Sequence, residues 1–147
     1  MTLTVFIDGL CSPINPNGIA TYGLVVYENG LKVGEEFRGL GEGQGMSNNV
    51  AEYQGLCAAL NWLLDQNLEN EEIIVKSDSR LLVNQMNGSW KCRGGLYVAK
   101  CREAQSLSKL FTRVLYVWIP REDNSEADNL SRLAYEDYCK TRKNKLA

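Results

Sequence analysis

The order of strand-like and helix-like segments limits this chain to a small number of folds. Apolar runs rich in β-branched residues come first as a group of three and then alternate with helical patterns. We predict strands over residues 2–8, 19–28, 31–38, 72–77 and 114–119. Apolar residues at i, i+3 and i+4 spacing predict helices over residues 53–64, 81–87, 96–111 and 124–138.

Two local patterns fix how these strands are expected to pair. Asn29-Gly30 favours a type I′ turn, so the second and third strands should form a hairpin. Leu31, Val33 and Phe37 alternate with charged residues, and we expect their side of the third strand to be buried. The later strand–helix–strand connections favour parallel strands added to one edge. We therefore predict an α/β fold with a mixed five-stranded sheet, three strands antiparallel and two parallel, covered by helices.

Four carboxylates lie where predicted elements begin or end: Asp8, Glu52, Asp78 and Asp128. If the first and fourth strands are neighbours, Asp8 and Asp78 emerge side by side. Carboxylates this close repel one another unless a cation lies between them. Hard oxygen ligands without histidine or cysteine suit Mg²⁺ or Mn²⁺. The pattern predicts a metal site.

Each carboxylate also has a simpler explanation. Glu52 fits a capping box that begins at Asn49, and Glu126 fits another one turn before Asp128. Asp78 could cap the helix that follows it, and Asp8 could belong to a turn. These separate explanations do not account for four carboxylates at converging element ends, so we favour the metal site.

The net charge bears on whether a nucleic acid can be the binding partner. Sixteen basic and eighteen acidic residues give a formal charge of −2, which becomes +2 once the four carboxylates are neutralised by metal. Basic residues also cluster locally, which favours phosphate binding, although solvated helix faces would give the same pattern. The clusters are Lys91, Arg93, Lys100, Arg102, Lys109 and Arg113, and Lys140, Arg142, Lys143 and Lys145.

Other classes of protein fit the sequence less well. The chain of 147 residues has the length of one domain, has no apolar run long enough to span a membrane, and begins without a signal-like segment. We expect a cytoplasmic protein. Five cysteines without CxxC spacing argue against a zinc site or a secreted disulfide framework, and Cys57 is expected in the core. The sequence leaves undecided whether one pair of these cysteines forms a disulfide.

Four segments, in this order, resemble type 1 ribonucleases H of the retroviral integrase-like superfamily: residues 6–9, 47–53, 76–79 and 119–128. The resemblance extends from Thr4 to about Ala134 and is strongest to the branch seen in archaea and some bacteria. It implies a ribonuclease H-like sheet, a catalytic domain over residues 1–139 and a basic C-terminal tail over residues 140–147.

The resemblance implies hydrolysis of the RNA strand of RNA–DNA hybrids with two Mg²⁺ ions, Mn²⁺ serving as a substitute. Asp8 would bridge both ions, Asp128 would help hold the one near the attacking water, and Glu52 and Asp78 would hold the other. Two ions can stabilise the attacking and the leaving oxygens together. The products would carry 5′-phosphate and 3′-hydroxyl ends. The resemblance does not decide whether double-stranded RNA is also cleaved. We expect the protein to be a monomer.

The resemblance also suggests where the substrate binds. Asn48 and Asn49 would contact both strands near the cleaved bond, and Arg80 would reach the minor groove, where 2′-hydroxyls distinguish RNA from DNA. Trp90 would either stack on the DNA strand or cap the core. The expected substrate-binding residues are Gly9, Asn15, Ser47, Asn48, Asn49, Arg80, Trp90, Lys91 and Arg93.

The chain departs from many relatives in two ways. It contains no histidine, so their mobile active-site histidine is missing, and their basic protrusion is reduced to Lys91-Cys92-Arg93. A catalytically silent nucleic-acid-binding module of the same fold is therefore one alternative. A different nuclease or recombinase of the superfamily is another. The complete set of four carboxylates favours an active ribonuclease H.

Overall fold

The computed structural model describes residues 1–146, with the side chains of residues 1–144. The strands are β1 (Thr2–Ser12), β2 (Ile19–Glu28), β3 (Leu31–Glu42), β4 (Glu72–Ser77) and β5 (Arg113–Trp118). The helices are α1 (Asn48–Asp65), α2 (Arg80–Met86), α3 (Val98–Ser108) and α4 (Ser125–Leu146), with a short 3-10 turn at Arg121–Asp123 before α4.

The strands form one mixed sheet in the order β3-β2-β1-β4-β5. β1 and β2 pair antiparallel, as do β2 and β3, whereas β4 is parallel to β1 and β5 is parallel to β4. The predicted sheet of three antiparallel and two parallel strands is confirmed. Asn29 and Gly30 both adopt positive φ, as the hairpin between β2 and β3 requires.

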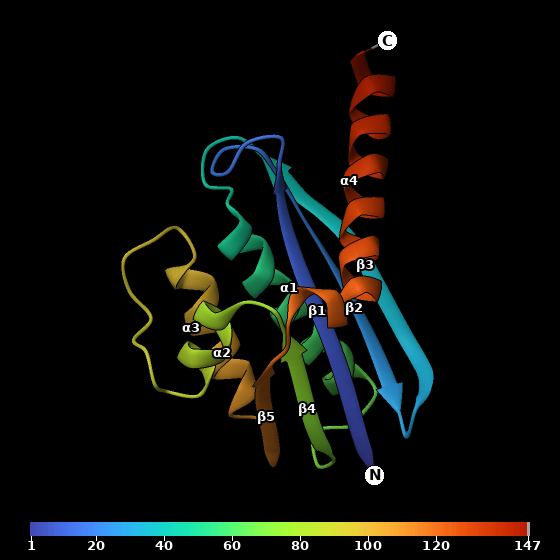
Figure 1. Ribbon diagram of the computed structural model, residues 1–147, viewed down its shortest axis with the longest axis vertical. Helices are drawn as coiled ribbons and strands as arrows, with labels where there is room; N and C mark the ends of the chain where they lie inside the picture. The colour runs from blue at the N-terminus through green and yellow to red at the C-terminus, as the bar shows by residue number, and fades with distance from the viewer. Residues whose placement is uncertain (147) are drawn as a thin grey trace.

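Helices cover both faces of this sheet. Figure 1 shows α4 in front of the sheet and α1 behind it. Leu3, Val5 and Ile7 of β1 belong to the same buried cluster as Leu56 and Leu60 of α1. α3 packs on α1, and α4 lies across β1, β2 and β3. α1 and α4 both begin near the point where β4 ends beside β1, and polar groups converge there.

The prediction that the first strand ends at Asp8 is wrong. β1 continues to Ser12, and Asp8 lies inside it, opposite Gly23 of β2. The pairing reaches Ser12 and Ile19 because β2 is long enough to cover the added residues. The chain leaves the strand only where Pro13 follows.

The expected burial of the third strand is also wrong at its start. Leu31 is 73% exposed and Val33 is 43% exposed. β3 is an edge strand, and its first residues belong to the hairpin end of the sheet. Alternating sequence identifies a strand but does not tell whether a helix reaches far enough to cover it.

Three further observations concern expectations from the sequence. No helix among residues 1–146 is long and apolar enough to cross a membrane. All five cysteines are free thiols in the described part of the chain, and Cys57 is buried. α4 continues into the basic segment, where Arg142 contacts Glu42 at 2.7 Å. Of the predicted tail, Ala147 and the side chains of Lys145 and Leu146 lie outside the described residues.

Candidate active site

Three of the four carboxylates meet at the junction of β1, α1 and β4. One carboxylate oxygen each from Asp8, Glu52 and Asp78 lies within 4.8 Å of the others. Asp8 and Asp78 are brought together because Ile7 pairs with Ser77 across the parallel strands β1 and β4. Glu52 comes from the first turns of α1.

Gly9 allows α1 to approach β1 closely enough for Glu52 to join Asp8. A Cβ atom on Gly9 would lie 2.4 Å from the backbone nitrogen of Glu52 and 2.7 Å from the carbonyl carbon of Ala51. Backbone atoms of a helix cannot move aside as a flexible side chain can. Gly9 was expected to contact substrate, and it does line the site cavity, but its contact with α1 is what the structure adds.

We expect Gly9→Ala to destabilise the fold by about 3 kcal/mol, because overpacking against backbone forces α1 away from the sheet. Urea denaturation of the purified variant measures this loss. Gly43→Ala is the control, because a Cβ atom on Gly43 would meet open space. Any loss of stability in this variant would come from the positive φ at Gly43 alone. Equal stability losses in the two variants would contradict the close approach at Gly9.

Asp128 lies beside this triad and is not one of its members. It projects from the first turn of α4, lines the same cavity, and forms an ion pair with Arg132 at 3.1 Å. After burial and the charge of Asp78, the nearby Asp128 carboxyl also contributes to the raised pKa of Asp8. The side chain of Asp128 is 21% exposed, which leaves it accessible from solvent.

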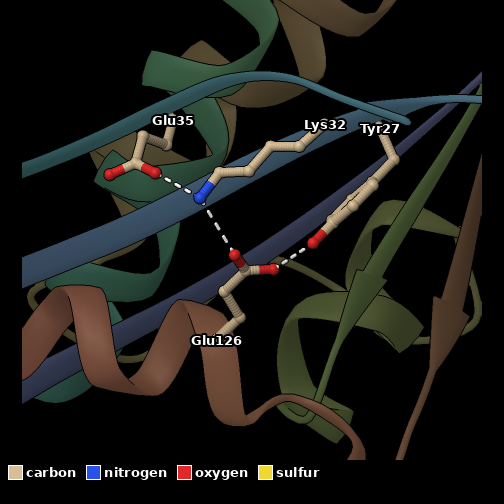
Figure 2. A network of polar contacts seen from close by, with 4 residues as sticks. All are labelled: Tyr27, Lys32, Glu35 and Glu126. Carbon is tan, nitrogen blue, oxygen red and sulfur yellow. Dashed lines mark hydrogen bonds and ion pairs between the residues drawn. The ribbon is translucent and has the colours of Figure 1, made fainter. Parts of the chain in front are cut away.

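Long-range contacts hold the start of α4 in place. The buried Asn124 amide donates to the carbonyl of Ile7 at 2.8 Å, directly beside Asp8. Figure 2 shows that Glu126 accepts a hydrogen bond from the Tyr27 hydroxyl and forms an ion pair with Lys32. The Lys32 Nζ lies 3.0 Å from Glu126 Oε2 and also contacts Glu35. The first turn of α4 is therefore attached to the β2–β3 hairpin, and Asp128 is fixed with it.

The capping explanations for Glu52 and Asp78 are wrong. Ser47 is the N-cap of α1, and its hydroxyl accepts from the Val50 backbone N–H at 3.1 Å. Ser79 is the N-cap of α2 and accepts from Leu82 at 3.1 Å. With the caps supplied by neighbouring serines, Glu52 and Asp78 are free to point into the site.

Burial and mutual repulsion disfavour the charged forms of these carboxyl groups. Burial, followed by the charge of Asp78, raises the pKa of Asp8 to about 8. Burial and the charges of Asp8 and Asp78 raise the pKa of Glu52 well above its usual value. Burial raises the pKa of Asp78 less, since Asn124 and Arg121 oppose the shift. The site concentrates negative charge that a cation would neutralise.

An open cavity of about 530 Å³ surrounds the carboxylates. Of the residues expected to contact substrate, it brings Gly9, Asn15, Asn48, Asn49 and Arg80 together. Two hydrogen bonds join Asn15 to Asn48, from Asn15 Nδ2 to Asn48 Oδ1 at 2.8 Å and from the Asn48 N–H to Asn15 Oδ1 at 2.9 Å. The loop between β1 and β2 is thereby fixed to the start of α1.

The other expected contact residues lie outside this cavity. Ser47 is buried and its hydroxyl oxygen is engaged in the helix cap. Trp90, Lys91 and Arg93 lie on the loop between α2 and α3. Trp90 is 49% exposed, so the alternative that it caps the core is wrong.

Trp118 also lines the cavity, and the sequence did not indicate it as a site residue. The guanidinium carbon of Arg80 lies 3.9 Å from the centre of the Trp118 ring, and the Trp118 indole N–H donates to the carbonyl of Asp78 at 3.2 Å. Trp118 pairs in register with Ser77 on the parallel strands β4 and β5. The predicted parallel pairing contained this signal, because the end of the fifth strand must lie beside Asp78.

Comparison with known proteins identifies close likenesses. A family model described as reverse transcriptase-like matches residues 8–134. The bifunctional protein Rv2228c of Mycobacterium tuberculosis is 37% identical over 124 residues, which are 83% of this chain and 32% of that protein. The chain thus spans about a third of the length of the mycobacterial relatives it matches. Ribonuclease HI of Halobacterium salinarum is 30% identical over 132 residues, 90% of this chain and 63% of that enzyme.

Solved structures agree with the sequence matches. The N-terminal RNase H domain of Rv2228c, solved as a fusion with maltose-binding protein, has a TM-score of 0.84 at 32% identity and covers 96% of this chain and 98% of that one. LC11-RNase H1 in complex with an RNA/DNA hybrid has a TM-score of 0.84 at 30% identity and covers 93% of this chain and 99% of that one.

Proposed function

Because the chain belongs to the reverse transcriptase-like family, and within it to the type 1 ribonucleases H, we propose that it is an endoribonuclease that hydrolyses the RNA strand of RNA–DNA hybrids. The observation that carries the proposal is the triad of Asp8, Glu52 and Asp78, the first two buried, with Asp128 beside it in the lining of an open cavity. Supporting it is the likeness to LC11-RNase H1, which was solved with such a hybrid.

The residues of this site fit a divalent metal. Glu52 Oε2 is buried and has no hydrogen-bond partner among the described residues, which is costly unless a ligand takes that position. The surrounding donors are carboxylate oxygens, the ligands that Mg²⁺ and Mn²⁺ prefer. Asp8, Glu52, Asp78 and Asp128 would hold two Mg²⁺ ions, with Mn²⁺ as a substitute.

When bound, the metal ions would supply Lewis-acid stabilisation of the attacking and leaving oxygens at the phosphate. The protein's own residues position the substrate. Asn48 and Asn49, at the start of α1, present amide groups at the cavity wall beside Glu52. Arg121 and Arg80 add positive charge to the lining of the same cavity, where they can bind phosphate oxygens. Arginine keeps its proton, so neither residue serves as a general base.

A cleavage assay with end-labelled substrates tests this function. We expect cutting of the RNA strand of a hybrid with Mg²⁺ and with Mn²⁺, no cutting of duplex DNA, and products with 5′-phosphate and 3′-hydroxyl ends. Duplex RNA in the same assay decides whether the activity extends to it. Hybrid binding without any cleavage would instead support a catalytically silent module. We also propose that the protein acts as a cytoplasmic monomer. Analytical ultracentrifugation would test whether it is monomeric.

Binding of hybrid should depend on the two exposed basic residues of the α2–α3 loop. Charge reversal at Lys91 and Arg93 should weaken binding and flatten the dependence of log Kd on log salt by about one unit for each phosphate that is no longer neutralised. Fluorescence anisotropy across a salt series measures the slope. Reversal of Lys109 and Arg113, near the other end of β5, changes the net charge equally and should leave the slope unchanged. Equal salt slopes for the two double variants would show that the loop does not contact the hybrid.

A further inference from the structure

We propose that a buried network centred on Gln85 positions the α2–α3 loop so that Lys91 and Arg93 meet the substrate at a fixed distance from the carboxylates. The α2–α3 loop comprises residues 87–97, between Met86 and Val98. The proposal rests on the proposed function, because it assigns to the residues behind the loop a role in presenting its basic side chains to a hybrid.

Backbone hydrogen bonds fix the first residues of the loop but not its middle. Residues 87–97 contain neither strand nor helix, and Lys91, Arg93, Gly94 and Gly95 are exposed. Residues 87–90 donate backbone hydrogen bonds to carbonyls of α2, whereas residues 91–94 form no backbone–backbone hydrogen bond among the described residues. Backbone groups in such a segment must find partners in side chains or solvent. The conformation of the middle of the loop therefore depends on the few side chains that reach it.

Gln85 and Tyr97 are those side chains. Gln85, on α2, is 2% exposed, and its amide nitrogen donates to the carbonyl of Lys91 at 2.9 Å and to the Tyr97 hydroxyl at 3.1 Å. The Tyr97 hydroxyl donates in turn to the carbonyl of Arg93 at 2.7 Å. The carbonyls of both basic residues are drawn inward, which leaves their side chains directed to solvent.

The same network reaches the helix that carries Glu52. The hydroxyl of Tyr53, the residue after Glu52 on α1, donates to Gln85 Oε1 at 2.6 Å. The rings of Tyr53 and Tyr97 stack with their centres 5.8 Å apart and their planes 10° from parallel. Tyr53 and Gln85 are both fully buried, so this connection between α1 and the loop is stiff.

A core that needed only packing would not require these groups. An apolar side chain of the same volume fills space without the cost of burying an amide and two hydroxyls. Two of the four hydrogen bonds in the network end on loop carbonyls, those of Lys91 and Arg93. We infer that the network sets where the two cations lie relative to the carboxylates, and thus which phosphate they bind when the cleaved bond is in the site.

Tyr97→Phe tests this role, because it removes the hydroxyl and keeps the ring that stacks on Tyr53. We expect KM for the hybrid to rise by about fivefold to tenfold, comparable to the loss of one hydrogen bond, with kcat changed by about twofold or less. The Kd for hybrid should rise by the same factor. Hydrogen exchange of the loop amides should become faster.

Tyr116→Phe is the matched control. Tyr116 is 7% exposed and its hydroxyl donates to Ser108 at 2.9 Å, between β5 and α3, without a contact to the loop carbonyls. It should lower the melting temperature about as much as Tyr97→Phe and leave KM, Kd and loop exchange unchanged. If both variants give the same Kd, the network is structural only and the proposal is overturned.

A double-mutant cycle separates positioning from general loosening. In a background with Lys91→Ala and Arg93→Ala, Tyr97→Phe should no longer raise Kd, since there are no basic side chains left to position. An undiminished rise in that background overturns the proposal. If Tyr97→Phe does not fold, Tyr53→Phe replaces it in the same double-mutant cycle, because it breaks only the hydrogen bond at the α1 end of the network. A wild-type protein that binds hybrid without cutting it contradicts the proposed function, whereas the Kd comparison still decides this inference.

Discussion

Asp8→Asn is expected to lower the rate of hybrid cleavage by at least about 10³-fold, the equivalent of the several kcal/mol that metal ions contribute to such reactions. Asparagine keeps the volume of the side chain but removes the negative charge at the centre of the triad. That charge lies within 4.8 Å of oxygens of both Glu52 and Asp78, where it would hold the metal ions.

Single-turnover cleavage of labelled hybrid measures the loss, with circular dichroism to verify that the variant is folded. Asp65→Asn, at the exposed C-terminal end of α1, removes one negative charge outside the site and should keep full activity. A rate for Asp8→Asn close to that of wild type would rule out the metal-site assignment.

Stability in metal-free buffer is expected to fall by about 4 kcal/mol between pH 5 and pH 8, which is about 1.4 kcal/mol for each pH unit over which the folded state holds about one proton more than the unfolded chain. The pKa of Asp8 is raised from 3.8 to about 8, so in this range the folded protein keeps a proton that the unfolded chain has lost. A raised carboxyl pKa thus makes folding less favourable as the pH rises. The raised pKa of Glu52 acts in the same direction.

Urea denaturation in EDTA at pH 5, 6, 7 and 8 gives this slope. Asp8→Asn should flatten it and should be more stable than wild type at pH 8, because the repulsion is relieved. Adding Mg²⁺ should stabilise wild type at pH 8 by binding only the folded state, and should stabilise the variant much less. Stability that is constant or rising from pH 5 to pH 8 would contradict the raised pKa values.

The arrangement of the sheet was predictable from local patterns in the chain. Strand periodicity, the Asn29-Gly30 turn and the strand–helix–strand connections are local or topological signals, and each depends on residues close together along the chain. They were sufficient to place Asp8 beside Asp78, because the parallel pairing of β1 and β4 puts Ile7 opposite Ser77. The order of the four carboxylate segments then indicated the family.

The contacts of those residues were not predictable from the sequence and became visible in the tertiary structure. It showed that Asp8 lies inside β1, that Gly9 lets α1 approach, and that Leu31 at the sheet edge stays exposed. Glu126 meets Tyr27 across 99 residues of sequence, and Gln85 meets Tyr53 across 32. Such contacts depend on how far each helix extends over the sheet and how closely it approaches. No periodicity in the chain encodes those distances, because they are set by the packing of all the elements together.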